Sequence, residues 1–226
     1  MIRFENVHKR YPNGREALSG VSFALERGEL AFLTGPSGAG KSTLLRLIAL
    51  IERPSRGTVL VNNQNTSRVS RRRIPRFRQR LGVVFQDHKL LYDRTVFDNV
   101  ALPLIIAGLG RREIERRVRA SLDQVGLLGR ESHAPITLST GEQQRVGIAR
   151  AIAGRPEVVI ADEPTGNLDP ELSLEIMQLF GRFNEVGVTL LIATHDLELI
   201  EALPHRRLRL VAGRIESDSA GGVRPA

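Results

Sequence analysis

The sequence has no cysteine at all and no long apolar run. The missing cysteines exclude disulfides, thiolate catalysis and zinc or iron–sulfur sites that cysteine would hold. A membrane-spanning helix needs about eighteen apolar residues, and here Pro103 and Gly108 interrupt the most apolar window, 100–109. The segment 1–5 has no apolar signal core either, so we expect a chain without a membrane span that stays in the cytoplasm.

Acidic residues are in the minority. There are 25 of them against 33 lysines and arginines, which gives a net charge of +8 and a sequence pI near 11.0. Such a surface favours anionic partners, namely nucleotides, nucleic acid or acidic lipid headgroups, and charge alone does not choose among them. With 226 residues, 41% of them hydrophobic, the chain fits one globular domain or a domain with a small subdomain.

Short apolar runs alternate with helical patterns. Four runs lack polar alternation, which is typical of strands buried on both faces of a parallel sheet: 30–34, 82–85, 158–161 and 188–193. Apolar residues recur at helical spacing in 114–125 and 172–183, and this alternation predicts an α/β fold. The segment 2–24 alternates more around a Pro-Asn-Gly turn, so we expect antiparallel hairpin structure there. The segment 218–226 is expected to be a flexible tail.

One segment fits the phosphate-loop pattern G-x-x-x-x-G-K-[ST]; its residues are Gly35, Pro36, Ser37, Gly38, Ala39, Gly40, Lys41 and Ser42, with Thr43 next. Small residues let consecutive backbone N–H groups wrap a phosphate, while Lys41 reaches the β- and γ-phosphates and the Ser42 hydroxyl can bind Mg²⁺. The following helix points its positive end at the same phosphates. Because a Gly-rich turn matches this pattern by chance only about once in a hundred such chains, the segment predicts a nucleotide site.

An acidic pair ends one of the expected strands. The apolar run 158–161 carries Asp162 and Glu163 to the carboxyl end of the sheet, where ligands bind in open α/β folds. There Asp162 can hold Mg²⁺ through water, and Glu163 can polarise an attacking water. Read alone, the pair could equally begin an ordinary helix, since Pro164 and Thr165 follow it.

Further elements resemble one family. The segment 138–145, Leu-Ser-Thr-Gly-Glu-Gln-Gln-Arg, closely resembles the signature motif of the ATP-binding-cassette (ABC) ATPases. Gln86 looks like the Q-loop glutamine of that family, 167–169 like its D-loop and His195 like its switch histidine. Tyr11 stands where the family stacks an aromatic ring on adenine.

The resemblance implies a P-loop NTPase fold of ABC type, a single domain over 1–226. Its RecA-like core, with an N-terminal antiparallel β part, would comprise 1–86 and 156–217. A helical subdomain that carries the signature motif would comprise 87–155.

The resemblance also implies a Mg²⁺-dependent ATPase that forms a homodimer around ATP. In each half, ATP would contact Tyr11 and the loop residues 35–43. The partner subunit would add its signature residues, which are Ser139, Thr140, Gly141 and Glu142. Mg²⁺ would be held by Ser42, Gln86 and Asp162, and catalysis would rest on Glu163, His195 and Gln86.

Each of these residues also has a simpler interpretation. His195 could make local hydrogen bonds at a strand end, Tyr11 could be a packing residue, and Gln86 could be a solvated amide. The signature segment, without the family, is a helix start capped by Ser139 or Thr140, whose free N–H groups attract an anion. The family has glycine and glutamine where this chain has Thr140 and Glu142, so we expect a working site with altered affinity.

Finer details resemble the bacterial cell-division members of the family, notably 2–7, 85–91, 93–96 and 103–108. This implies an ATPase at the cytoplasmic face of the inner membrane, docked through 86–100 on a polytopic membrane protein of FtsX type. ATP-driven changes in that partner would regulate cell-wall hydrolysis. An ATPase of a lipoprotein-release or MacB-type transporter is the alternative. DNA-repair and ribosomal members are disfavoured, because they carry a coiled-coil insertion or two cassettes.

The segment 68–80 holds seven arginines, at positions 68, 71, 72, 73, 76, 78 and 80. A solvated helix face that keeps the protein in solution is one interpretation. Contact with acidic lipid headgroups or an acidic partner loop is the functional one, since about 1 kcal/mol per basic residue is available at such a surface. Nucleic acid is the third and least expected partner.

Overall fold

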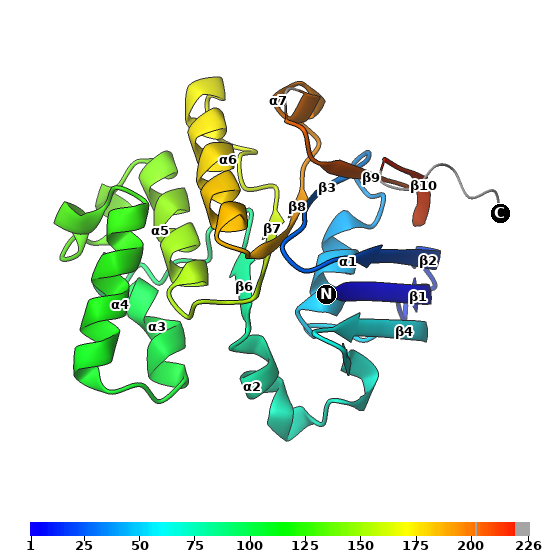
Figure 1. The fold of residues 1–226 in the computed structure, drawn as a ribbon, viewed down its shortest axis with the longest axis horizontal. Helices are drawn as coiled ribbons and strands as arrows, with labels where there is room; N and C mark the ends of the chain where they lie inside the picture. The colour runs from blue at the N-terminus through cyan, green and yellow to red at the C-terminus, as the bar shows by residue number, and fades with distance from the viewer. Residues whose placement is uncertain (202, 220–226) are drawn as a thin grey trace.

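The computed structural model describes residues 1–201 and 203–219, which form two sheets with helices between and beside them (Figure 1). The first sheet is antiparallel and has the order β2-β1-β4-β5. Its strands are β1 (Ile2–Arg10), β2 (Glu16–Leu25), β4 (Arg56–Val61) and β5 (Gln64–Asn65). The hairpin of β1 and β2 turns at 11–15, so the expected antiparallel start of the chain is confirmed.

The second sheet has the order β10-β9-β3-β8-β7-β6 and is parallel except for its edge strand β10. Its strands are β3 (Leu30–Thr34), β6 (Leu81–Val84), β7 (Val158–Asp162), β8 (Thr189–Ala193), β9 (Arg206–Val211) and β10 (Arg214–Asp218). Four of them correspond to the four runs without polar alternation. The run of β3 shows why, because Phe32 packs into one hydrophobic core and its neighbours Ala31 and Leu33 into the other.

Helices cover both faces of this parallel sheet. They are α1 (Lys41–Ile48), α2 (Ile74–Arg78), α3 (Val96–Ile106), α4 (Arg111–Gln124), α5 (Thr140–Ile152), α6 (Pro170–Glu185) and α7 (Leu197–Glu201). Four short 3₁₀ segments complete the chain: η1 (Thr66–Arg68), η2 (Arg71–Arg73), η3 (Leu128–Arg130) and η4 (Pro135–Thr137). Helix α1 lies between the two sheets, while α3, α4 and α5 gather at the opposite end of the molecule (Figure 1). The division of the chain at 87 and 156 stays a prediction.

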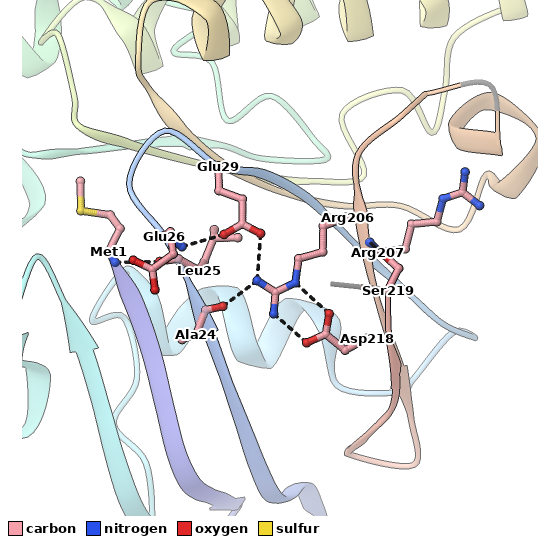
Figure 2. Close-up of polar contacts among 9 residues, drawn as sticks. All are labelled: Met1, Ala24, Leu25, Glu26, Glu29, Arg206, Arg207, Asp218 and Ser219. Atoms are coloured by element: carbon pink, nitrogen blue, oxygen red, sulfur yellow. Dashed lines mark hydrogen bonds and ion pairs between the residues drawn. The ribbon is translucent and has the colours of Figure 1, made fainter. Parts of the chain in front are cut away.

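Strand β10 corrects the expected tail. Asp218 is its last residue and pairs with the guanidinium of Arg206 at 2.6 and 2.8 Å, and Ser219 exchanges hydrogen bonds with Arg207 (Figure 2). The prediction of a flexible tail was therefore wrong for 218 and 219, because the half-buried side chain of Arg206 holds Asp218 and the backbone of Arg207 holds Ser219. The rest of that segment, 220–226, lies outside the described residues.

The same arginine joins the two sheets. Arg206 also donates to the Ala24 carbonyl at 2.7 Å and to Glu29 at 2.9 Å, so β9 and β10 are tied to the end of β2 (Figure 2). Over the described ranges 1–201 and 203–219, no helix has the length and apolar character needed to cross a membrane.

Candidate functional site

The phosphate loop lies between β3 and α1, and two of its glycines have no room for a side chain. A Cβ on Gly35, whose φ is +139°, would lie 1.9 Å from the Leu210 carbonyl oxygen. A Cβ on Gly40, whose φ is +111°, would lie 2.5 Å from the Ala17 carbonyl oxygen. Glycine at both positions therefore lets the loop pass close to two strands and turn directly into α1.

Lys41 is the first residue of α1, and its side chain is only 8% exposed. Its ammonium donates to the carbonyls of Gly35 at 2.6 Å and Pro36 at 3.3 Å, inside the phosphate loop. It also lies 3.6 Å from a carboxylate oxygen of Glu163. A positive charge is thus fixed between the loop and the acidic end of β7.

Glu163 follows β7 directly and has a left-handed backbone conformation, with φ +48°. This turn is held by its N–H, which donates to the Ala193 carbonyl at 2.9 Å. One of its carboxylate oxygens accepts from the ring Nδ1 of His195 at 2.8 Å and from the His195 backbone N–H at 3.2 Å. The carboxylate is 12% exposed and the imidazole 65% exposed, so a largely covered carboxylate contacts an exposed histidine. Non-glycine residues in this conformation are uncommon and cluster at functional sites.

The side chain of Asp162 lies at the start of α1, beside Glu163 and His195. Burial raises the pKa of Asp162, although a hydrogen bond with Ser42 works in the opposite direction. Its Oδ1 is buried and has no hydrogen-bond partner among the described residues. An unpartnered carboxylate oxygen beside a serine hydroxyl is a donor set that suits Mg²⁺, a hard cation that prefers oxygen. No group of three or more metal-binding side chains occurs in the described ranges, so a metal here would need further ligands from phosphate or water.

Most of these side chains line one open cleft of about 810 Å³, while Asp162 lines a neighbouring cavity that Ser42 and Gln86 also line. The cleft is lined by Tyr11, Asn13, Arg15, Pro36, Ser37, Gly38, Ala39, Gly40, Lys41, Ser42, Thr43, Arg46, Gln86, Glu163 and His195. Nearly every residue that was expected to contact the nucleotide, apart from those of the signature motif, therefore lies in this one cleft. Asn13, Arg15 and Arg46 were not predicted. Arg15 closes the hairpin turn that presents Tyr11, and its guanidinium donates to the Gly38 carbonyl at 3.4 Å.

Tyr11 is fixed at the rim of this cleft by its hydroxyl, which lies 3.2 Å from the Thr43 hydroxyl and donates to Glu52 at 3.0 Å. The ammonium of Lys9 lies 5.0 Å from the centre of the ring and 2.7 Å from Glu52. Burial alone would raise the pKa of Glu52, but hydrogen bonds from Lys9 and Tyr11 outweigh it and lower that pKa. The ring is thus held in one orientation beside the phosphate loop.

Gln86 also lines the cleft, and α5 holds the loop that follows it. The guanidinium of Arg150 donates to the carbonyls of His88 and Lys89, and the His88 imidazole lies 2.5 Å from the Gln144 side-chain oxygen. His88 and Lys89 both have positive φ, 56° and 49°. These contacts were not predicted, because nothing in the spacing of 86–89 and 144–150 indicates them.

The signature residues do not line the cleft of their own chain, and α5 lies well away from α1 (Figure 1). Ser139 caps α5 in a reciprocal box: its hydroxyl accepts from the Glu142 N–H at 3.2 Å, and Glu142 accepts from the Ser139 N–H at 2.9 Å. Thr140 begins the helix, so its N–H and that of Gly141 point out of the helix end. A Cβ on Gly141 would lie 2.1 Å from a Leu172 methyl carbon, which ties this end to α6.

The capping box predicts a pH effect at Glu142. The Ser139 N–H lowers the pKa of this carboxyl from its usual 4.5, although partial burial opposes that shift. A lowered folded-state pKa gives stability that is present above pH 4.5 and lost as the pH falls through the folded-state value. We expect Glu142→Gln to cost about 0.5 kcal/mol at neutral pH and nothing well below pH 4.5. Urea unfolding at both pH values measures this; a cost that persists or grows in acid contradicts it.

Comparison with known proteins identifies the class of this molecule. Residues 18–166 match the ABC transporter family, and the chain belongs to that family. It is an ABC ATPase, an enzyme that hydrolyses ATP, and its fold is the P-loop fold that the signature motif implied.

Particular relatives narrow this further. The cell division ATP-binding protein FtsE of Escherichia coli K12 is 56% identical over 223 residues, which cover 99% of each chain. FtsE of Bacillus subtilis 168 is 44% identical over 98% of this chain and 97% of its own. A solved dimeric structure of the ATP-binding cassette MJ0796, in a post-hydrolysis state bound to ADP and Pi, is 35% identical, with a TM-score of 0.89 and coverage of 96% and 97%.

Proposed function

We propose that this chain is the ATP-driven subunit of a cell-division complex at the cytoplasmic face of the bacterial inner membrane. Its ATP-bound dimer would change the shape of a polytopic membrane protein of FtsX type and so regulate cell-wall hydrolysis. The observation that carries this proposal is the 56% identity with a cell division ATP-binding protein along 99% of both chains.

ATP would occupy the cleft with its phosphates in the loop 35–42. The ammonium of Lys41 would exchange its two loop carbonyls for phosphate oxygens, since a charge-assisted bond to an anion is the stronger one. Ser37 to Gly40 would offer backbone N–H groups, and Tyr11 would stack on the base. The free N–H groups of Thr140 and Gly141 on a second copy would bind the γ-phosphate from the opposite side.

Mg²⁺ would be held by Ser42 and Asp162, with Gln86 at its edge, and would supply charge neutralisation on the phosphates. The unpartnered Oδ1 of Asp162 supports this assignment.

Hydrolysis would depend on Glu163 and His195. The Glu163 carboxylate is positioned by the His195 backbone and ring and by Lys41, so it can orient a water toward the γ-phosphate. The exposed imidazole can turn from Glu163 to the phosphate and stabilise its developing charge.

The membrane partner would dock in a groove of about 570 Å³. The groove runs between α2 and β6 on one side and α3 and α5 on the other, and Phe85, Pro103 and Ile106 are among its apolar lining. Ile106 is 61% exposed, unusual for a side chain of this type. Lys89 and Arg150 line the groove as well, so the loop 86–89 extends from the cleft, at Gln86, to this surface, at Lys89. The docking segment predicted as 86–100 would thus be extended by α2 and the end of α3.

Co-purification tests this proposal. Tagged Glu163→Gln protein, held with ATP and pulled from detergent-solubilised native membranes, should bring an FtsX-type protein with division components. Adding Ile106→Glu should remove the partner without changing ATP binding, because a carboxylate would enter the groove. Val186→Glu is the matched control, since Val186 is 78% exposed on another helix end. Recovery of a lipoprotein-release or MacB-type permease would instead establish the alternative function.

A further inference from the structure

The arginine-rich segment 68–80 forms a positively charged surface. Between Arg53 and Gln86 the chain has nine arginines and no acidic residue. Two of these arginines have structural roles: Arg53 donates to the carbonyls of Thr66, Ser67 and Val69, and Arg78 donates to those of Ala49 and Leu50. These bonds fix the backbone of η1, η2 and α2 against the antiparallel sheet and α1.

The remaining arginines of the segment are exposed. Among the described residues none of their side chains has a hydrogen bond or an ion pair; they are Arg68, Arg71, Arg72, Arg73, Arg76 and Arg80. Elsewhere on the surface several arginines are paired, for example Arg116 with Glu113 at 2.8 Å. An ordinary solvated helix face would have acidic residues interspersed with the basic ones. The segment 53–86 itself has none, and none of the six side chains forms an ion pair among the described residues, which indicates an external anionic partner.

The position of the segment 68–80 in the fold indicates which kind of anionic partner it binds. Helix α2 and the 3₁₀ turns before it form the lower edge of the molecule in Figure 1, away from α4 and α6. Arg78, Gln79 and Leu81 line the groove that we assign to the membrane protein, so Arg80 lies at its edge and the other exposed arginines precede it on the same segment. A segment beside a docked membrane protein faces the lipid around it. The aromatic ring of the segment, Phe77, is buried at 7% exposure, which leaves no platform on which bases could stack.

We propose that the six exposed arginines of 68–80 bind the anionic headgroups of the membrane surface and orient the ATPase on its partner. This inference rests on the proposed function for the orientation, while the lipid contact itself depends only on this chain. Guanidinium groups match phosphate geometry and are weakly hydrated, which suits the headgroup region. The attraction falls off within a Debye length, so it should weaken steeply with salt.

Vesicle sedimentation tests the lipid contact without any membrane protein. The full chain should bind phosphatidylcholine vesicles that contain phosphatidylglycerol, at low salt, and should not bind pure phosphatidylcholine. The combined variant Arg71→Gln, Arg72→Gln and Arg73→Gln should lose about tenfold or more of this affinity. The matched control is Arg27→Gln, Arg112→Gln and Arg214→Gln, which removes the same charge from exposed arginines elsewhere and should keep wild-type binding.

Three results would overturn the inference: equal loss in both triple variants, equal binding to neutral vesicles, or tighter binding to RNA than to anionic vesicles at the same salt. Equal loss in both variants would mean that vesicle binding depends only on the net charge of the protein. Tighter binding to RNA would make the segment a nucleic-acid surface. Failure of the co-purification with intact vesicle binding would overturn the proposed partner and leave the lipid contact standing.

Discussion

Glu163→Gln is expected to bind ATP and to hydrolyse it at least about a hundredfold more slowly than the wild type. The amide keeps the size of the side chain and can still accept from His195, so the cleft should keep its shape. It can no longer attract a proton from the water, and the buried negative charge 3.6 Å from Lys41 is gone. ATP should therefore bind at least as tightly, and the ATP-bound dimer should accumulate.

Phosphate release measures the rate of ATP hydrolysis, and light scattering measures how much ATP-bound dimer accumulates. Glu171→Gln is a suitable control, because it makes the same change at an exposed glutamate in the first turn of α6. It should leave turnover unchanged. Turnover of Glu163→Gln within threefold of wild type would remove Glu163 from the hydrolytic step.

Arg206→Met is expected to destabilise the fold by about 3 kcal/mol while leaving the cleft residues in place. The guanidinium is 13% exposed and serves Asp218, Glu29 and the Ala24 carbonyl at once. The hydrogen bonds with Asp218, foremost, and Glu29 raise the pKa of Arg206 against the effect of burial. Methionine would leave both carboxylates in a half-buried place without this cation, and the edge strand β10 would keep its backbone pairing with β9 but lose this side-chain attachment.

Arg209→Met is the control on the same strand. Arg209 pairs with Glu216 at 2.7 Å, but both side chains are more than half exposed, so its loss should cost about 0–1 kcal/mol. Urea unfolding of both variants gives the comparison. Equal midpoints for Arg206→Met and Arg209→Met would mean that the buried network contributes little to stability.

The centre of the parallel sheet could be predicted from the sequence because four of its strands are short apolar runs with no polar alternation. Such runs are buried on both faces, as Ala31, Phe32 and Leu33 show. The phosphate loop was predictable for a local reason, since Gly35 and Gly40 occupy conformations and close approaches that only glycine allows.

What the sequence did not reveal are contacts between distant segments. Arg206 looks like any surface arginine in a basic strand, yet it lies between three chain segments that fold together only in the tertiary structure. The hydrogen bonds from Arg150 to the loop after Gln86 join residues that are about sixty positions apart in the sequence. No local pattern marks either residue, and the tail was misassigned at Asp218 for this reason.

The signature motif is a different case. Its residues were recognised from their order alone, but in one chain they lie outside the cleft. We propose that Thr140 and Gly141 bind the γ-phosphate held by another copy, so that two copies enclose ATP between the loop of one and the α5 end of the other.

The cysteine-free chain offers the most direct test. Ser37→Cys and Thr140→Cys would be placed in separate copies of the Glu163→Gln protein, mixed, and treated with a short bis-maleimide. A covalent dimer is expected to form with ATP and Mg²⁺ and not with ADP. A yield that is the same with and without ATP, or no cross-link under any condition, would contradict the enclosed-ATP dimer.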